Sequence, residues 1–108
     1  MRIRVPPKRI RELFMLTYEL HGCQRAVDCL CKYYGVRRMR VILNGRKVGN
    51  GYSAWYVENK AYFKKRGLRK RTILHEFYHH LFLSKELDKP KRVEEKEARD
   101  YAREFLIL

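Results

Sequence analysis

The sequence predicts a single α+β domain spanning residues 1–108, with helices at the N-terminus, a small and mostly antiparallel three-stranded sheet, a central helix and a C-terminal helix. Apolar residues recur at helical spacing near both ends of the chain, whereas turn dipeptides divide the middle into short strand-like runs. A chain of 108 residues suits one domain with a single hydrophobic core.

The first third of the chain has two helical patterns. Pro6 and Pro7 interrupt regular structure, and the pattern after them ends at Gly22. A second helix is predicted over residues 24–34, with Gly35 as its C-terminal cap. The apolar side of the first pattern consists of Ile10, Leu13, Phe14, Thr17 and Leu20.

The middle of the chain predicts three strands, over residues 39–43, 52–57 and 61–63. Two Asn-Gly dipeptides in residues 44–51 indicate turns, and another turn is expected at residues 58–59. We expect these strands to pair as a meander.

The last third begins with the basic stretch 64–71, which is predicted to be a linker. Residues 72–83 carry apolar side chains around much of a helix circumference, as in a central helix packed on several sides. Residues 92–105 predict the last helix, whose apolar face comprises Ala98, Tyr101, Ala102 and Phe105.

The formal charge of +14 allows two interpretations. It can attract nucleic acid or another polyanion, or it can belong to a surface rich in ion pairs, as in thermophile proteins. No apolar run reaches the roughly 18 residues of a membrane helix, and residues 1–7 lack the apolar part of a signal peptide, so we expect a cytoplasmic protein. Cys23, Cys29 and Cys31 form no C-x-x-C pair, and we expect free thiols.

The central helix contains the motif His75-Glu76-Phe77-Tyr78-His79. Residues four apart on a helix differ by only about 40° in direction, so both histidines can bind one metal ion. Zinc suits imidazole ligands, and Glu76 is placed to activate water without binding the metal itself. The alternative is a pair of core histidines with Glu76 in a salt bridge. His80 points about 100° away from His79 and is interpreted as a bystander.

A catalytic zinc site needs a third protein ligand, and the last helix offers three glutamates. Glu97 lies well off the apolar face of that helix. Glu94 and Glu95 flank the face about equally, so periodicity does not choose between them. The small Ala98 and Ala102 would allow this helix to approach the metal helix closely.

Residues 72–81, followed by residues 95–102, resemble the T-x-x-H-E-x-x-H and E-x-x-A-x-x-F-A pattern of gluzincin peptidases of the ImmA/IrrE type, and above all the small archaeal minigluzincins. The resemblance implies a zinc metallopeptidase with His75, His79 and Glu95 as ligands and Glu76 as the catalytic base. Tyr101 stands where the family often has Phe. Arg99 stands where the family tends to have an Asn or Asp that orients a ligand.

The expected substrate is an extended peptide or protein segment, which can bind at a sheet edge by adding a strand. The candidate edge is formed by Ser53, Ala54, Trp55, Tyr56 and Val57. The alternative is that Trp55 and Tyr56 are ordinary strand residues facing the core. Among the many tyrosines, none can be chosen as the group that stabilises the oxyanion. We expect a monomer or small oligomer with no membrane partner.

The chain ends in an apolar run, Phe105, Leu106, Ile107 and Leu108. These residues either complete the core or fold back into the cleft and block it. The minigluzincins that the chain resembles are kept latent by terminal segments, so we expect autoinhibition by residues 105–108, with residues 1–7 as a weaker candidate.

The leading alternative function is a basic module that binds nucleic acid or regulates another protein, with a structural or vestigial metal site. Its support is the basic stretch 64–71 together with Arg37, Arg38 and Arg40. Such a module would bind nucleic acid with a steep salt dependence that Glu76→Ala leaves unchanged.

Overall fold

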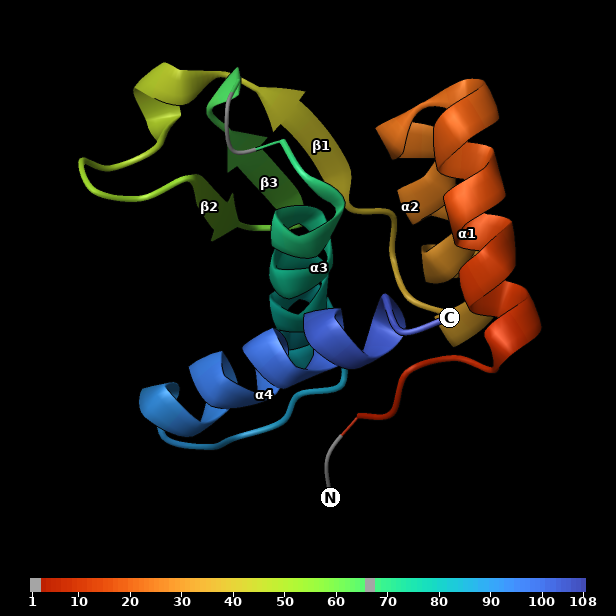
Figure 1. Cartoon of the computed structure of the whole chain (residues 1–108). Helices are drawn as coiled ribbons and strands as arrows, with labels where there is room; N and C mark the ends of the chain where they lie inside the picture. Colours follow the sequence, from red (N-terminus) through yellow and green to blue (C-terminus); the bar gives the residue numbers. More distant parts are fainter. Residues whose placement is uncertain (1–2, 66–67) are drawn as a thin grey trace.

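The computed structural model describes residues 3–65 and 68–108. Helix α3 (Lys70–Ser84) lies at the centre, between the sheet and helix α4 (Lys91–Phe105), which crosses it (Figure 1). Helices α1 (Lys8–His21) and α2 (Cys23–Tyr34) pack against each other at one side. The α+β class predicted from the sequence is confirmed.

Proline and glycine set the ends of the first two helices, as predicted. The carbonyl of Pro7 accepts hydrogen bonds from the N–H groups of Ile10 and Arg11 in the first turn of α1. Gly22 separates α1 from α2 with a φ of 90°, which only glycine adopts readily. Gly35 caps α2 in the left-handed conformation with a φ of 68°.

The sheet is mixed, and its order is β1 (Arg40–Leu43), β3 (Lys60–Phe63), β2 (Ala54–Val57). The hairpin of β2 and β3 is antiparallel, whereas β1 runs parallel to β3. The expected meander order is therefore wrong. Residues 44–53, which include the short 3-10 helix Gly45–Lys47, connect β1 to β2 and are long enough for β3 to take the place beside β1.

One edge of the sheet is covered and the other is open. Gln24 of α2 donates from Nε2 to the carbonyl of Met39 at 2.9 Å and accepts at Oε1 from the N–H of Val41 at 2.7 Å. These contacts satisfy backbone groups along the outer side of β1. Strand β2 forms the opposite edge and lies against α3.

The core gathers around α3, whose residues from Ile73 to Phe82 are buried apart from the half-buried His75. Helix α4 contributes its predicted apolar face, all four members of which are buried: Ala98, Tyr101, Ala102 and Phe105. The rings of Tyr78 and Tyr101 lie 5.4 Å apart between α3 and α4. The free cysteines are half-buried at positions 23 and 29 and buried at position 31.

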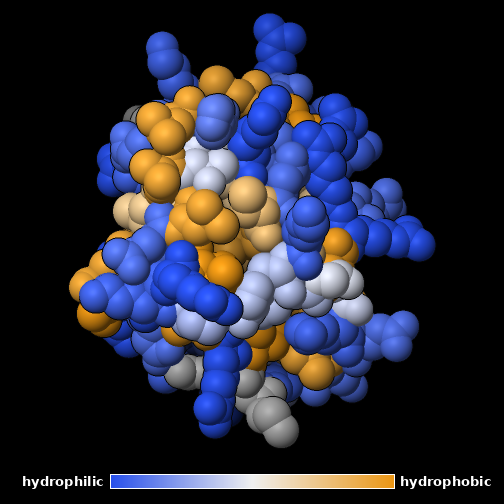
Figure 2. Space-filling view, turned by 90° about the vertical axis from the view of Figure 1, so that its right-hand side faces the viewer, coloured by the Kyte–Doolittle hydropathy of each residue, from blue (hydrophilic) through white to orange (hydrophobic). Residues whose placement is uncertain are grey.

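The face of the molecule that includes α1 shows apolar side chains surrounded by hydrophilic ones (Figure 2). On α1 the exposed apolar side chains are Leu13, Leu16 and Leu20. Within the described ranges, no helix has both the length and the apolar character that a membrane crossing requires.

Candidate metal centre

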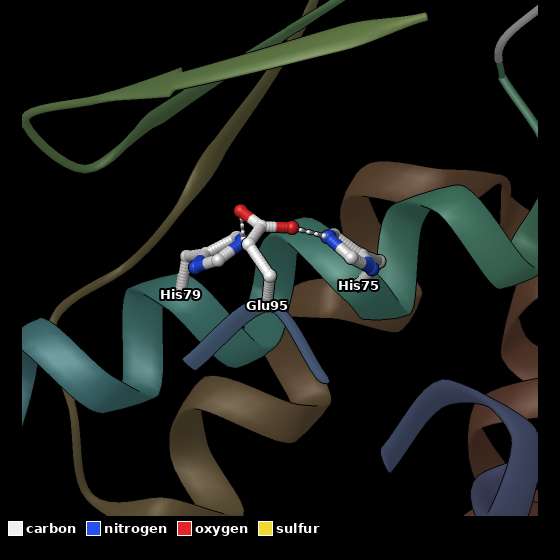
Figure 3. Close-up of side chains that lie close together, drawn as sticks. All are labelled: His75, His79 and Glu95. Atoms are coloured by element: carbon white, nitrogen blue, oxygen red, sulfur yellow. Dashed lines mark hydrogen bonds and ion pairs between the residues drawn. The ribbon is translucent and has the colours of Figure 1, made fainter. Parts of the chain in front are cut away.

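Three side chains meet where α4 crosses α3 (Figure 3). His75 Nε2 lies 3.0 Å from Glu95 Oε2, and His79 Nε2 lies 3.1 Å from Glu95 Oε1. The carboxylate of Glu95 thus bridges the two imidazoles. One potential ligand atom from each of the three residues lies within 4.8 Å of the others, so the group could hold a metal ion.

The arrangement follows from two local features of the sequence. The four-residue spacing places His75 and His79 on one side of α3, with their rings 5.0 Å apart. Ala98 and Ala102 of α4 are buried and present only methyl groups, so this helix lies close enough to bring Glu95 to both rings. A larger side chain at either alanine would push the helices apart.

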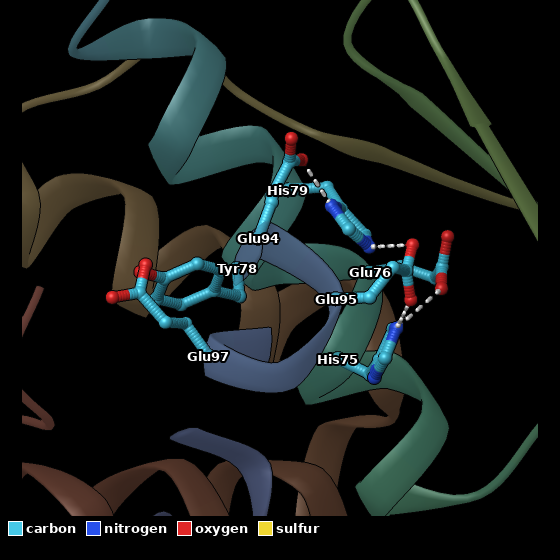
Figure 4. A network of polar contacts seen from close by, with 7 residues as sticks. All are labelled: His75, Glu76, Tyr78, His79, Glu94, Glu95 and Glu97. Atoms are coloured by element: carbon cyan, nitrogen blue, oxygen red, sulfur yellow. Dashed lines mark hydrogen bonds and ion pairs between the residues drawn. The ribbon is translucent and has the colours of Figure 1, made fainter. Parts of the chain in front are cut away.

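Glu94 has a different position from Glu95. Its Oε2 atom lies 2.5 Å from His79 Nδ1, on the far side of the ring from Glu95 (Figure 4). A neutral imidazole that donates from Nδ1 leaves Nε2 with a free electron pair for a metal. The structure therefore separates the two glutamates that periodicity alone left equivalent.

Glu76 lies beside the three residues without joining them. Its Oε2 atom is 3.9 Å from His75 Nε2, and the residue is 9% exposed. Burial raises the pKa of Glu76 to about 7, and the nearby charge of Glu95 adds to the increase while those of His79 and Lys91 oppose it. A carboxylate with such a pKa can both accept and release a proton near neutral pH.

His75 is the less constrained of the two histidines. Burial, followed by the charge of His79, lowers the pKa of His75, and Arg99 also lowers it, against the opposing effect of Glu95. The neutral imidazole that results is the form that binds metals. No hydrogen bond orients His75 Nδ1 among the residues the structure describes, so Arg99 does not orient this ring through a hydrogen bond.

Glu97 lies off the site, as periodicity indicated. It accepts a hydrogen bond from the hydroxyl of Tyr78 at 3.0 Å and one from Nζ of Lys89 at 2.9 Å. These contacts join the loop before α4 to the two helices, away from the imidazole rings (Figure 4).

His80 faces away from the candidate metal centre and links α3 to β2 and to the segment before β1. The ring is fully buried, with Nε2 2.5 Å from the carbonyl of Arg37 and Nδ1 2.8 Å from the hydroxyl of Tyr56. Burial lowers the pKa of His80, so the ring is neutral. The carbonyl of Arg37 can only accept, so the proton of the neutral ring is on Nε2 and Nδ1 accepts from the hydroxyl of Tyr56. This second hydrogen bond fixes β2 against α3.

The candidate metal centre borders a cleft of about 910 Å³. The predicted edge segment 53–57 forms one wall, and β2 is the open edge of the sheet. Trp55 is 41% exposed in this wall and does not face the core, whereas Tyr56 is half-buried and packs against the core, as the alternative expected. The remaining lining residues are Tyr52, Arg71, Thr72, His75, Glu76, His79, Leu83, Lys91, Glu94, Glu95 and Arg99.

The C-terminal residues do not line this cleft. Phe105 is fully buried and its ring packs edge-on against Phe14 at 5.1 Å, while Arg11 Nη1 donates to the carbonyl of Ile107 at 2.6 Å. The structure contradicts the expectation that residues 105–108 occupy the cleft. The reason is that Phe105 continues the apolar face of α4 and draws the end of the chain toward α1.

Some of the basic residues behind the alternative function have contacts or positions within the fold. Arg38 pairs with Asp28 at 2.9 Å, and the last residues of the basic stretch 64–71 belong to α3. Residues 66–67 of that stretch, and residues 1–2 of the weaker autoinhibitory candidate, lie outside the described residues.

The basic residues of the cleft were not predicted from the sequence to lie beside the ligands. Arg71 precedes His75 by four positions, and Lys91 and Arg99 flank Glu95 by four positions on either side. The helical spacing that found the histidine pair would also have placed these three cations beside the ligands.

The donor set fits a metal ion by its chemistry, because two imidazole nitrogens and one carboxylate are ligands that zinc accepts in catalytic sites. Comparisons of the chain with models of protein families, with curated proteins and with solved structures find no match.

Proposed function

We propose that the chain is a zinc-dependent endopeptidase in which His75, His79 and Glu95 hold the metal and Glu76 is the catalytic base. The observation that carries this proposal is the position of Glu76, buried beside the three-residue group and bordering the same cleft without being part of the group. A purely structural metal site has no use for such a carboxylate.

A zinc ion in this position would supply Lewis-acid chemistry, lowering the pKa of water and polarising a peptide carbonyl. In the proposed reaction Glu76 accepts a proton from the attacking water as its oxygen adds to the carbonyl carbon. Glu76 then delivers that proton to the amide nitrogen as the C–N bond breaks. Glu94 keeps His79 in the tautomer that presents Nε2 to the metal.

Extended peptides are the proposed substrates because the open edge of β2 borders the metal centre. Residue pairs of an antiparallel hairpin exchange hydrogen bonds at alternate positions. The N–H of Lys64 donates to the carbonyl of Ser53 at 3.1 Å, so Ser53 belongs to a bonded position. By this alternation, the N–H and C=O groups of Ala54 and Tyr56 point away from β3 and are available to a substrate strand.

Peptide hydrolysis by the zinc-loaded protein tests the reaction, with Glu76→Gln as the decisive variant. Loss of a general base lowers kcat by about 10²–10⁴-fold, and the isosteric amide keeps the packing of α3. Glu12→Gln is the matched control, because Glu12 is an exposed residue of α1. Glu76→Gln protein that is folded, binds zinc and still hydrolyses peptides at the wild-type rate would overturn the proposal.

Substrate binding along β2 is tested by Ala54→Pro, which removes the outward N–H without touching the ladder to β3. Ala54→Val keeps the N–H and controls for size. Loss of one backbone hydrogen bond should raise KM by about tenfold with little change in kcat. Equal KM values for the two variants would show that peptides do not add to this edge.

A further inference from the structure

Two arginines border the cleft at the end where His75 lies. Arg71 precedes His75 by one helical turn on α3, and Arg99 follows Glu95 by one turn on α4. Glu95 Oε2 lies 3.0 Å from His75 Nε2, so each arginine lies one helical turn away from the same contact between α3 and α4. Lys91 precedes Glu95 by one turn of α4, so Lys91 and Arg99 lie on opposite sides of Glu95 along the helix.

Neither guanidinium is bound by another side chain that the structure describes. Among residues 3–65 and 68–108, no side-chain hydrogen bond or ion pair involves Arg71 or Arg99, and both residues are exposed. Elsewhere cations do pair, as Arg38 does with Asp28 and Arg103 does with Asp100. The three acidic side chains of the cleft lie against the histidines: Glu95 contacts both rings, Glu94 contacts His79, and Glu76 Oε2 is 3.9 Å from His75 Nε2.

We infer that Arg71 and Arg99 form a binding site for a carboxylate of the substrate, at the His75 end of the cleft. Guanidinium groups match a carboxylate geometrically and bind it through paired hydrogen bonds. The inference rests on the proposed function, because the cleft must hold a peptide for the site to be used. The carboxylate can come from an acidic side chain or from the C-terminus of a peptide.

Binding of dye-labelled peptides to zinc-loaded Glu76→Gln protein, followed by fluorescence anisotropy, tests the site without hydrolysis. One peptide carries an internal Glu and an amidated C-terminus, a second carries Gln with a free C-terminus, and a third carries Gln with an amidated C-terminus. The peptide with the matching carboxylate should bind about ten- to a hundredfold more tightly than the third. Which of the first two peptides gains identifies the source of the carboxylate.

The preference should disappear when Arg71→Gln and Arg99→Gln are combined. Arg92→Gln is the matched control, because Arg92 is an exposed residue of α4 that does not line the cleft. That variant removes the same charge and should retain the preference, which separates a local site from attraction by the overall charge of +14.

Equal binding of all three peptides, or a preference that survives the loss of both arginines, would overturn the inference, as would failure of every peptide to bind. A different result would contradict the proposed function alone. If the zinc-loaded wild-type protein cleaves none of the peptides but binds them with an arginine-dependent preference, the carboxylate site stands and the peptidase assignment falls.

Discussion

At the scale of single residues, His79 is held by two carboxylates with different tasks. Glu95 faces Nε2, the nitrogen available to a metal, and Glu94 faces Nδ1. Carboxylates that accept from the second imidazole nitrogen fix the ring and raise its basicity. Because Glu94 and Glu95 are adjacent in the sequence, their different contacts with His79 could not be predicted from the sequence.

Glu94→Ala should lower zinc affinity by about 10–100-fold while leaving a bound metal detectable. Glu95→Ala should weaken zinc binding further, because it removes a ligand. Glu97→Ala, on the same helix but away from the rings, serves as the control. Competition with a zinc-binding dye measures all three, and a Glu94→Ala protein with wild-type affinity would refute the assigned role.

The hydroxyl groups of Tyr34 and Tyr101 should make the free energy of unfolding depend on pH. The hydroxyl of Tyr34 donates to the carbonyl of Arg4 at 2.8 Å and lies 2.8 Å from the hydroxyl of Tyr101. Burial raises the pKa of Tyr34 to about 12 and places that of Tyr101 well above 10. The folded state therefore keeps both protons at a pH where the unfolded chain releases them.

Stability due to this pair is fully present below pH 10.0, the ordinary tyrosine pKa, and is lost as the pH rises toward about 12. Tyr34→Phe should cost about 1 kcal/mol at pH 8, and the gap to wild type should narrow at pH 11. Urea unfolding at both pH values measures the gap. A gap of constant size would mean that the hydroxyl does not titrate differently in the folded state.

At the scale of elements, the hydrogen bond between Tyr56 and His80 holds strand β2 against helix α3. Tyr56→Phe would leave the buried Nδ1 atom of His80 without a partner, at a cost of about 1–3 kcal/mol in the free energy of unfolding. Tyr62→Phe is the matched control, since no described hydrogen bond involves the hydroxyl of Tyr62. Thermal or urea unfolding that shows equal losses would contradict a structural role for the link.

The boundaries of the first two helices could be predicted from the sequence, because Pro7, Gly22 and Gly35 end regular helix through their own backbone conformations. The order of the strands in the sheet could not be predicted in the same way. Periodicity identifies a strand and its turn residues, but the choice between β2 and β3 as the neighbour of β1 depends on contacts distant in sequence. The role of His80 was hidden for the same reason, since its partner lies on β2.

The candidate site could be predicted in part. The spacing of His75 and His79 indicates a shared metal without any tertiary information. The choice of Glu95 over Glu94 needs the rotation of α4 relative to α3, which the apolar face defines too coarsely. The resemblance to gluzincins indicated the residue that the structure brings to both rings.

At the scale of the whole molecule, Phe105 and the half-buried Leu106 pack into the core, and the C-terminal run 105–108 does not line the cleft. Phe105→Ala should lower the free energy of unfolding by about 3–5 kcal/mol, because the side chain is fully buried against Phe14. Ile107→Ala, at a position 68% exposed, should change it by less than about 0.5 kcal/mol. Unfolding curves measure both changes.

Neither substitution should raise peptidase activity per folded molecule, because neither side chain lies in the cleft. Activation by Phe105→Ala in protein that remains folded would show that the end of the chain restrains the site after all.

The zinc content of the purified protein, after zinc is supplied and the excess removed, tests the central claim most directly. The His75, His79 and Glu95 group predicts about one tightly held zinc ion per chain. Folded His79→Ala protein should retain far less. A folded wild-type chain that retains no zinc, or one that retains as much zinc without His79 as with it, would contradict the metal centre.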